Sequence, residues 1–507
     1  MTRWIERVGL SRRVPAWLRE LSTTPEKFQR PSADFRDYVE SRRGFFDRFA
    51  SVADAWVRRN PEYHRAVRSL ARYYIPPHAR VLEIGCGTGD LLAALSPSDG
   101  LGVDLSGEMI CLAKKKHPGL RFRQMVAEEL DLGGEQFDYI VLSDLLGLLY
   151  DIRQVFERLR GVCHARTRIV IHCYSRLWQP VISLTEWLGA RPPLPILNWT
   201  TPEDVENFLY LAGFELVHRR GHILLPRRVP GLTSLANRYL AYLPGLRWFC
   251  LTGWVVARLA GMEPEPPPSR VSVICPCRNE AGNIEPLVRR LPHMGSHTEL
   301  IFVEGHSRDA TLEECRRVAT AYPDRDVKVF VQDGTGKANA VHLGLARATG
   351  DVVIILDADL SVAPEDLPQF YELLAGGKGE FVIGSRLVYT TDPGAMRFLN
   401  LVGNRAFALL LSWILGQPIK DTLCGTKALL REDYTRIAAG RHYFGDFDPF
   451  GDFDLIFGAV KLNLRMVEVP VRYRARVYGQ TNISRFTHGW LLFRMSAKAA
   501  ARLLFVS

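Results

Sequence analysis

Two acidic residues end an apolar stretch in the second half of the chain. The run Val352–Leu356 is followed directly by Asp357 and Asp359. Residues two apart on an extended chain point the same way, so we expect both carboxylates to face one hard cation, Mg²⁺ or Mn²⁺. Such a cation clamps the diphosphate of a departing nucleotide. The pattern predicts that Asp357 and Asp359 are the metal ligands of a phosphate-handling enzyme.

A second chemical signal is a glycine turn in the first half of the chain. The apolar run that starts at Val81 leads into Gly85, Gly87 and Gly89. Glycines let the backbone approach a ligand closely. Where a dinucleotide-binding turn carries its last glycine, this chain has Asp90, and a carboxylate there repels a pyrophosphate. The turn therefore favours a nucleoside that lacks phosphate, such as an adenosyl cofactor.

Acidic residues follow this turn where a nucleoside offers hydrogen-bond donors. Asp104 ends the next apolar stretch, where a carboxylate accepts both ribose hydroxyls, and Glu128 is positioned for an adenine amino group. Methyl transfer depends mainly on aligning the acceptor, the methyl group and the sulfur, so a methyltransferase sequence need not show an acid or base signature. We interpret Asp144, His172 and Tyr174, which lie near strand ends, as structural rather than catalytic.

These residues resemble the class I S-adenosylmethionine-dependent methyltransferases across about residues 40 to 225. The resemblance implies that Glu83 and the glycine turn hold the methionine end of S-adenosylmethionine, that Asp104 holds the ribose and that Glu128 holds the adenine edge. It also places Leu105 among the cofactor-binding residues. The alternative is a Rossmann-like domain that binds no cofactor.

Polar turns surround the aspartate pair of the second half. They are Val273–Glu280, Val303–Thr311, Gly334–Ala340, Gly384–Arg386 and Asp421–Lys427. In this order they resemble the family 2 glycosyltransferases of the GT-A fold, across about residues 270 to 480, and among them the polyprenyl-phosphate (dolichol-phosphate mannose type) sugar transferases. The resemblance implies a nucleotide-sugar site made of Pro276, Glu280, Glu304, Asp309, Lys337, Asp357 and Asp359.

The acceptor of the sugar leaves two alternatives open. A hydroxyl acceptor needs a general base, and Asp452 and Asp454 are the catalytic candidates unless they cap the helix that begins there. A phosphate acceptor is already an anion and needs no base. In that case guanidinium groups bind the phosphate through paired N–H donors, and the predicted phosphate-binding residues are Arg386, Arg397 and Arg476. Arg386 is also predicted to take part in catalysis.

Regular elements must position these side chains, and apolar stretches alternate with helical patterns in both halves. The expected strands of the first half are 81–84, 100–104, 137–142 and 168–172. Those of the second half are 271–274, 300–304, 327–330, 352–356 and 380–383. Such alternation predicts parallel sheets with right-handed crossovers, and ligands then bind at the carboxyl ends of the strands. The fold class is α/β, with an N-terminal Rossmann-like methyltransferase domain and a C-terminal GT-A domain.

A proline-rich segment divides the two halves. Gly261–Ser269 holds four prolines in five residues, which end a helix or a sheet ladder and form a stiff linker. The expected organisation is a helical segment over residues 1–75 that caps the methyltransferase, a methyltransferase domain over 76–226, an amphipathic segment with the linker over 227–269, a glycosyltransferase domain over 270–480 and a basic amphipathic tail over 481–507.

Composition places the protein in the cytoplasm. The 507 residues suffice for two cores, and 47% hydrophobic with 24% charged residues is ordinary for a globular protein. Nine cysteines form no disulfide pattern and are expected to stay reduced. The chain starts without a signal peptide, and its apolar runs fall short of the roughly 20 residues that span a bilayer.

The net charge of +10 is concentrated toward the C-terminus. Arginines border the amphipathic stretch Met396–Leu415, and basic residues accompany the apolar pairs around Trp490 and Leu503. These features predict peripheral association with the inner, anionic face of the cytoplasmic membrane and no binding to nucleic acid. Ordinary core packing is the alternative for these helices.

The combined interpretation is a bifunctional enzyme. It transfers a methyl group from S-adenosylmethionine, and a sugar from a nucleotide donor to a polyprenyl phosphate or another lipid-linked acceptor. One alternative is a glycosyltransferase whose N-terminal domain only senses a cofactor or scaffolds a partner. A sugar-phosphate nucleotidyltransferase is disfavoured, because Pro276–Glu280 stands where its glycine-rich signature belongs.

Overall fold

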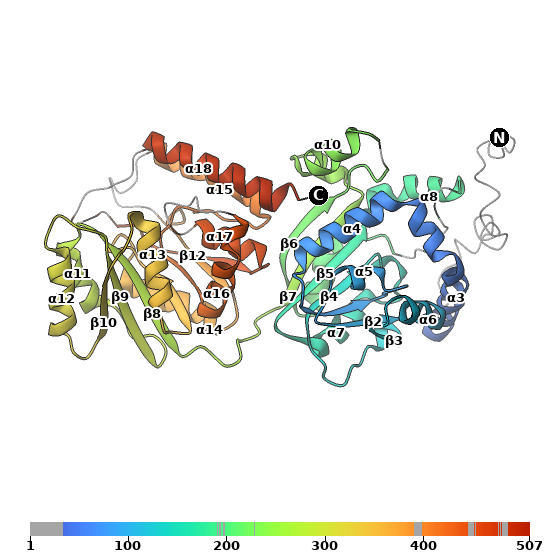
Figure 1. Ribbon diagram of the computed structural model, residues 1–507, viewed down its shortest axis with the longest axis horizontal. Coiled ribbons are helices and arrows are strands. Elements are labelled where there is room, and N and C mark those ends of the chain that lie inside the picture. Colours follow the sequence, from blue (N-terminus) through green and yellow to red (C-terminus); the bar gives the residue numbers. More distant parts are fainter. Residues whose placement is uncertain are drawn as a thin grey trace. The chain divides into compact units, whose positions relative to one another are not determined.

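The computed structural model describes residues 34–189, 191, 194–195, 198–227, 229–389, 398–444, 451, 453–474, 476, 478 and 485–506. The chain divides into two units. The first is Met1–Leu259 with Val506–Ser507, and the second is Ala260–Phe505. Each unit is built on its own sheet (Figure 1). The division falls at the start of the predicted proline-rich linker.

The sheet of the first unit follows the strand order β3-β2-β1-β4-β5-β7-β6. Its strands are β1 Arg80–Ile84, β2 Asp99–Asp104, β3 Arg121–Gln124, β4 Phe137–Ser143, β5 Cys163–Tyr174, β6 Phe214–His222 and β7 Thr252–Leu259. The strands from β3 to β5 pair in parallel, as the alternating pattern predicts. Each of the four strands expected in this half is confirmed within these bounds.

Strand β7 corrects the expected boundary of the first domain. Residues 227–269 were expected to form an amphipathic segment and a linker. Thr252–Leu259 instead pairs antiparallel with both β5 and β6, and all of its residues are buried. The order along the chain hides this insertion, because β7 comes last in sequence yet enters between two earlier strands.

Helices pack around this sheet, and α4 crosses its front in Figure 1. Apolar side chains of α4, among them Val67 and Leu70, pack against Val81 of β1 and Val141 of β4. The helices are α3 Phe35–Arg59, α4 Pro61–Tyr74, α5 Asp90–Ala94, α6 Gly107–Lys116, α7 Ile152–Leu159, α8 Gln179–Trp187, α9 Pro202–Leu211 and α10 Leu232–Arg238. Short 3-10 turns include η3 Ala127–Glu129, η4 Leu146–Leu148, η5 Arg160–Val162, η6 Arg176–Trp178, η7 Leu240–Tyr242 and η8 Leu246–Phe249.

Helix α3 is fastened to α6 by polar contacts. Ser106 Oγ, at the N-cap of α6, donates to Asp47 Oδ1 at 2.6 Å. Lys116 Nζ, in the last turn of α6, lies 2.8 Å from Asp54 Oδ1. The carboxylates of Asp47 and Asp54 therefore hold α3 at both ends of α6, beside the carboxyl end of β2.

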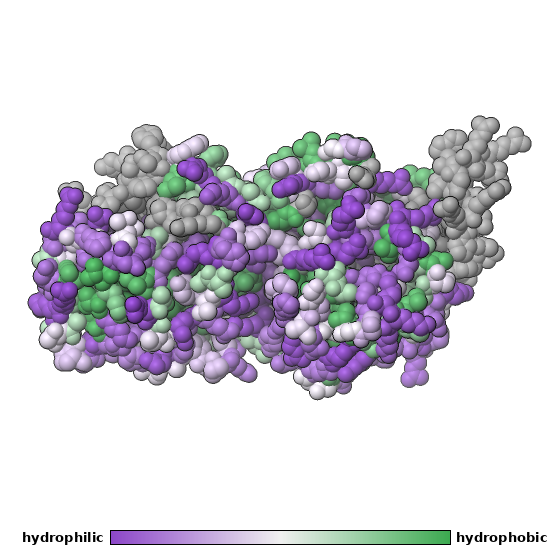
Figure 2. Space-filling view, viewed as in Figure 1, coloured by the Kyte–Doolittle hydropathy of each residue, from purple (hydrophilic) through white to green (hydrophobic). Residues whose placement is uncertain are grey.

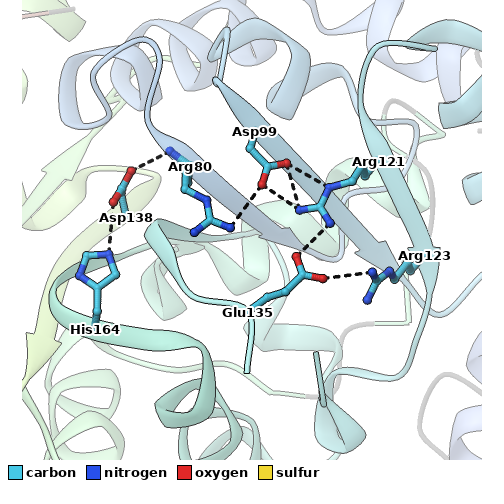
Figure 3. Close-up of polar contacts among 7 residues, drawn as sticks. All are labelled: Arg80, Asp99, Arg121, Arg123, Glu135, Asp138 and His164. Carbon is cyan, nitrogen blue, oxygen red and sulfur yellow. Dashed lines mark hydrogen bonds and ion pairs between the residues drawn. The ribbon is translucent and has the colours of Figure 1, made fainter. Parts of the chain in front are cut away.

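An ion-pair network closes the opposite, amino edge of this sheet (Figure 3). Arg121 Nη2 lies 3.0 Å from Asp99 Oδ1, and Arg121 Nη1 lies 2.9 Å from Glu135 Oε2. On the neighbouring strands, the Arg80 backbone N–H donates to Asp138 Oδ2 at 2.8 Å, and His164 Nε2 lies 3.2 Å from Asp138 Oδ1. Mutual pairing satisfies these charges, so we interpret this edge as structural.

The sheet of the second unit follows the strand order β10-β9-β8-β11-β13-β12-β14. Its strands are β8 Arg270–Cys277, β9 His297–Glu304, β10 Asp326–Val331, β11 Val352–Ile355, β12 Phe381–Ser385, β13 Lys427–Leu430 and β14 Met466–Pro470. Strands β10, β9, β8 and β11 run parallel, and β13 is antiparallel to both β11 and β12. The expected strands are confirmed, whereas β13 and β14 were missed.

The helices of the second unit are α11 Ala281–Arg290, α12 Thr311–Ala321, α13 Gly336–Arg347, α14 Leu367–Ala375, α15 Phe398–Leu415, α16 Arg431–Ala439, α17 Phe453–Lys461 and α18 Arg485–Ala499. They are joined by 3-10 turns at η9 Pro364–Asp366 and η10 Arg441–Tyr443 and followed by a π turn at Ala500–Leu504. A Cβ at Gly344 of α13 would overlap Ile274 of β8, so this glycine lets α13 pack tightly against the sheet. Helix α15 confirms the stretch predicted from Met396, although 396 and 397 lie outside the described residues.

Within the described parts of the chain, no helix has the length and apolar character needed to cross a bilayer.

Candidate functional sites

The glycine turn of the first unit adopts the backbone conformation that its sequence predicts. Gly85, Gly87 and Gly89 have φ values of 72°, 52° and 76°, in the left-handed region that glycine enters without strain. A Cβ at Gly85 would also lie 2.8 Å from a methyl carbon of Leu145. The turn therefore needs glycine for both backbone angle and space, and it exposes backbone beside the carboxyl end of β1.

Asp104 is held by the turn itself. Its Oδ2 accepts a hydrogen bond from Gly87 N at 2.9 Å, and its Oδ1 accepts one from Ser106 N at 2.9 Å. Burial raises the pKa of the Asp104 carboxyl from its ordinary value. The carboxylate lies at the end of β2, where the sequence predicts a partner for ribose hydroxyls.

Glu83 lies deeper than the other predicted cofactor residues. Its Oε2 accepts from Leu92 N at 3.0 Å, and only 3% of the residue is exposed. Burial raises the pKa of its carboxyl to about 8. Glu83 thus supports the turn and the start of α5 from below.

Glu128 lies in η3 and accepts a hydrogen bond from Tyr150 N at 2.9 Å. Burial raises the pKa of its carboxyl as well. The Tyr150 ring packs against Tyr38 and Phe35 of α3, with centroids 5.2 and 5.5 Å apart. Helix α3 therefore covers the acid predicted to bind the adenine edge.

A cavity of about 440 Å³ joins these residues in the first unit. Five of the seven predicted cofactor residues line it: Gly85, Gly87, Asp104, Leu105 and Glu128. Glu83 and Gly89 stand behind this wall. A ligand-sized cavity with a few converging polar groups is the usual form of a small-molecule site.

The far end of the cavity carries a polar cluster that the sequence did not reveal as a site. Asp144, at the end of β4, has a φ of 54°, and its Oδ2 accepts from Tyr63 Oη at 2.6 Å. His172 Nδ1 lies 3.5 Å from Asp144 Oδ1, and the Tyr63 ring stacks on Tyr174 with centroids 5.8 Å apart. Asp144, Tyr63 and Tyr174 all line the cavity.

The sequence analysis did not identify Tyr63 or Arg191 as site residues. The Arg191 guanidinium lies 4.5 Å from the Tyr174 ring centroid. Both reach the cavity from segments far from the glycine turn, α4 and the stretch after α8. The local signal in the sequence was an acidic residue, Asp144, after a predicted strand; its left-handed conformation is known only from the structure.

In the second unit, basic side chains converge on the aspartate pair. Lys337 Nζ lies 2.6 Å from Asp357 Oδ1, and Arg476 Nη2 lies 2.6 Å from Asp359 Oδ2. Arg476 Nη1 also lies 3.7 Å from Glu280 Oε1. The fold therefore brings together five predicted residues that are widely separated along the chain.

Two of these acids, Glu280 and Asp357, have shifted pKa values. Burial, with Asp359 nearby, raises the pKa of Glu280 to about 7. Burial also favours the neutral form of Asp357, yet Lys337, together with Lys427 and Arg476, outweighs it and holds the pKa of Asp357 below its ordinary value. Burial thus favours the neutral form of Glu280, whereas the neighbouring cations keep Asp357 ionised.

Gly425 and Lys427, just before and at the start of β13, complete the surroundings of Asp357. A Cβ at Gly425 would overlap Asp357 Oδ2, so only glycine leaves room for this carboxylate. Lys427 is fully buried, and its Nζ donates to Cys424 O at 2.5 Å. Its positive charge adds to that of Lys337 in lowering the pKa of Asp357. Neither role was predicted, because β13 was not recognised as a strand beside β11.

The predicted nucleoside residues lie at the carboxyl ends of β8 and β9. Asp309 Oδ2 accepts from Ala281 N at 3.4 Å and from Tyr478 Oη at 3.2 Å. Burial raises the pKa of the Asp309 carboxyl, but hydrogen bonds from Thr311, Ala281 and Tyr478 together hold it below its ordinary value. Glu304 is buried, and its Oε1 accepts from Ser307 N at 2.5 Å, while Pro276 lies within β8. Glu304 thus shapes the loop after β9.

Arg386 is engaged by a buried partner. Its Nε and Nη2 lie 2.7 and 2.8 Å from the two carboxylate oxygens of Asp421, and its backbone N–H donates to Oδ2 at 3.0 Å. Despite burial, this guanidinium holds the pKa of Asp421 below its ordinary value. The Arg386 guanidinium, which was predicted to bind an acceptor phosphate, thus binds the Asp421 carboxylate in this structure.

Asp454 lies at the start of α17 and is almost fully buried. Its Oδ2 lies 2.7 Å from Arg441 Nε and 3.2 Å from His342 Nε2. Asp452, the other predicted base, and Arg397, a predicted phosphate ligand, lie outside the described residues.

The donor groups of both sites fit the predicted small molecules. Asp357 and Asp359 offer the hard oxygen ligands that Mg²⁺ and Mn²⁺ prefer, and the two cations now paired with them show that the position takes positive charge. No group of three or more His, Cys, Asp or Glu poised for a metal occurs within the described ranges. Any ion there would complete its shell with a diphosphate or water. In the first unit, the glycine turn and the two acids suit a nucleoside that lacks phosphate.

Comparison with known proteins finds a family match within each unit. A model described as methyltransferase domain matches residues 55–219, and one described as glycosyl transferase family 2 matches residues 272–436. A glycosyltransferase of Haloferax volcanii, AglJ, is 29% identical over 230 residues, which cover 45% of this chain and 71% of the relative. A dolichol-phosphate mannosyltransferase of Pyrococcus furiosus is 28% identical over 219 residues, 42% of this chain and 59% of the relative.

Among solved structures, the putative methyltransferase in complex with the Haloferax volcanii Trm112 activator is 18% identical. The structural alignment covers 42% of this chain and 97% of that methyltransferase, with a TM-score of 0.34. Each family match falls within one of the two α/β units. The first unit therefore carries a methyltransferase domain, and the second carries a family 2 glycosyltransferase domain with a GT-A-like fold.

Proposed function

We propose that the protein is bifunctional. Its first unit transfers a methyl group from S-adenosylmethionine, and its second unit transfers a sugar from a nucleotide donor to a polyprenyl phosphate or a similar lipid-linked acceptor. The observation that carries the proposal is the convergence of Lys337 and Arg476 on the acidic pair Asp357 and Asp359. Alternating charges of this kind suit a metal ion bound to a diphosphate.

Each residue of the second site has a distinct role in this proposal. Asp357 and Asp359 would hold the divalent ion, which supplies charge stabilisation to the departing nucleotide. Lys337 and Arg476 would turn to the diphosphate oxygens, since ammonium and guanidinium donors bind phosphate strongly. Glu280 and Asp309, at the carboxyl ends of neighbouring strands, would bind the nucleoside.

A phosphate acceptor agrees with the surroundings of Asp454. A general base needs access to the proton it removes. Asp454 instead lies buried between Arg441 and His342. An acceptor phosphate is already an anion and attacks the anomeric carbon without a base, with inversion of configuration. The name of the Pyrococcus furiosus relative, a dolichol-phosphate mannosyltransferase, supports the same acceptor class.

A polyprenyl phosphate resides in a membrane, so we place the protein at the cytoplasmic face of the cytoplasmic membrane. Trp490 and Phe493 of α18 and Leu409 of α15 are exposed, and the sequence around α18 is basic. Exposed apolar side chains next to basic ones suit the interface of an anionic membrane.

Donor binding tests the glycosyl half directly. We expect one class of UDP-, GDP- or dTDP-sugar, with Mn²⁺, to raise the melting temperature of the second unit, because a ligand that binds only the folded state stabilises it. Asp357→Asn and Asp359→Asn should remove the shift, whereas Asp324→Asn, at an exposed acid of the same unit, should keep it. If both site variants keep the thermal shift, the assignment is refuted.

S-adenosylmethionine binding and turnover test the methyl half. We expect calorimetry to detect binding that Asp104→Asn weakens, and S-adenosylhomocysteine to form in the presence of a membrane extract. Tight binding without any S-adenosylhomocysteine would favour the alternative, in which the first unit only senses the cofactor or scaffolds a partner.

A further inference from the structure

A wall of the cavity in the first unit has an apolar outer surface. Helix α8 and the turn η6 before it line the cavity with Trp178, Ile182 and Thr185. The same two elements expose Leu177 and Leu184 to solvent. Large apolar side chains that gather on one surface mark a binding face rather than ordinary scatter.

A second apolar segment continues this surface. Trp178 Nε1 donates to Phe249 O at 2.8 Å, which ties η6 to η8. Helix α10 and η8 expose further large apolar side chains: Leu232, Leu235, Tyr239, Leu246, Trp248 and Phe249. The green side chains over α10 are visible in Figure 2. We call the exposed apolar residues of η6–α8 and α10–η8 the apolar face. Its most exposed members include Trp187 at 55% and Trp248 at 61%.

The charge along the second segment of the apolar face is of one sign. No acidic residue occurs between Glu215 and Glu263, whereas this stretch carries several arginines. Arg238 and Arg247 are exposed, and their guanidinium groups lie 5.7 and 5.5 Å from the ring centroids of the exposed Tyr239 and Trp248. Aromatic rings beside cationic side chains are typical of surfaces that enter the headgroup region of anionic membranes.

The apolar face and the cavity share residues. Val181 of α8 lines the cavity and is also exposed, and Arg227 and Leu251, which flank the second segment, line the cavity too. Aromatic side chains of α3, Phe46 and Phe49, line the cavity as well. A molecule that crosses from the apolar face would therefore meet apolar walls before it reaches the polar cluster at Asp144.

We infer that the apolar face binds to an anionic lipid bilayer and that the methyl acceptor is a membrane lipid, which enters the cavity between α8 and the α10–η8 segment. This inference rests on the proposed methyl transfer. It assigns the acceptor class, which neither family match specifies. Protein partners are less suited to the α10–η8 part of this surface, because residues 216–262 include arginines but no acidic residues that could set a specific register.

Hydrogen exchange on the full chain tests this membrane binding. We expect vesicles of phosphatidylglycerol and phosphatidylethanolamine to slow amide exchange in 177–187 and 229–249 but not in 202–211, where Tyr210 is 76% exposed on the same unit. Vesicles of phosphatidylcholine alone should protect far less. Protection that appears without vesicles as protein concentration rises would show a second copy on this face and overturn the inference.

Variants test the energetics of this membrane binding. Arg238→Gln with Arg247→Gln should weaken vesicle binding through this face by about thirtyfold, since each basic residue near an anionic surface contributes about 1 kcal/mol. Trp187→Ser with Trp248→Ser should remove the protection, and the control Tyr210→Ser with Leu211→Ser should keep it. Trp490→Ser alters only α18, so vesicles should still slow amide exchange in the apolar face of this variant.

Transfer of labelled methyl groups tests the acceptor class. With S-adenosylmethionine labelled in the methyl group and vesicles made from a bacterial polar lipid extract, we expect label in the organic phase, and loss of that label in the Trp187→Ser, Trp248→Ser variant with unchanged cofactor affinity. Label that stays in water-soluble products, or organic-phase label that the variant does not reduce, overturns the inference. Failure to bind S-adenosylmethionine would instead refute the proposed function of the first unit.

Discussion

The Lys337 ammonium lies 2.6 Å from Asp357 Oδ1, although the two residues belong to different elements, α13 and the loop after β11. The contact neutralises a half-buried carboxylate at the carboxyl end of β11. A diphosphate with its metal ion offers both partners a replacement, negative oxygens for the lysine and a cation for the aspartate. Several measurable consequences follow from this pairing and its counterparts.

Removing the Lys337 charge should weaken donor binding. In Lys337→Gln we expect the affinity for a nucleoside diphosphate with Mn²⁺, measured by calorimetry, to fall about tenfold, because a charge-assisted hydrogen bond is lost. Lys378→Gln, at an exposed lysine of the same unit, should leave it unchanged. Equal affinities in all three proteins would contradict the proposed role.

Adding one methyl group next to Asp357 should disturb the metal position. Gly425→Ala places a Cβ on the Asp357 carboxylate, which must then move. We expect the Mn²⁺-dependent thermal shift with the donor to disappear. Gly403→Ala is the matched control, since a Cβ there meets nothing within 4 Å. A full thermal shift in Gly425→Ala would show that this carboxylate is not a ligand.

Breaking the Arg386–Asp421 pair should destabilise the second unit. Asp421 is fully buried, so Asp421→Asn leaves a guanidinium without its counter-charge, at a cost of about 3 kcal/mol. Urea unfolding measures the loss. The exposed pair of Arg290 with Glu365 gives the control, because Glu365→Gln should change stability by less than about 1 kcal/mol. Similar losses in both variants would indicate that burial of the pair is not decisive.

The buried Glu83 should make the stability of the first unit depend on pH. Its pKa is about 8 when folded, against an ordinary value of 4.5, so unfolding releases a proton between these values and stability falls as the pH rises through that window. Glu83→Gln should flatten this dependence and stabilise the unit at alkaline pH by up to about 5 kcal/mol. Thermal unfolding across pH measures it, and parallel curves for the two proteins would contradict the prediction.

The polar cluster at Asp144 should affect methyl transfer without affecting cofactor binding. If the carboxylate accepts the acceptor's proton, Asp144→Asn should lower methyl transfer by about a hundredfold and Tyr63→Phe by less. Calorimetry should show unchanged affinity for S-adenosylmethionine. Asp138→Asn, in the network at the opposite edge of the sheet, is the control. Unaltered turnover in Asp144→Asn would restore the structural interpretation drawn from the sequence.

Local sequence determined the elements that carry the chemistry. The left-handed angles of Gly85, Gly87 and Gly89 and the acids at the ends of β2 and β11 follow from short-range sterics and from strand periodicity, which a few residues encode. The strand alternation likewise predicted both parallel sheet regions. These features need no knowledge of distant contacts.

The tertiary structure decided which distant groups meet. It inserted β7 between β5 and β6, set β13 beside β11 so that Gly425 lies against Asp357, and gave Arg386 a carboxylate partner. It also brought Arg476 to Asp359 and Tyr63 to Asp144. Long-range pairing depends on how whole layers pack and on which charges must be neutralised once buried, and neither is written in the spacing of neighbouring residues.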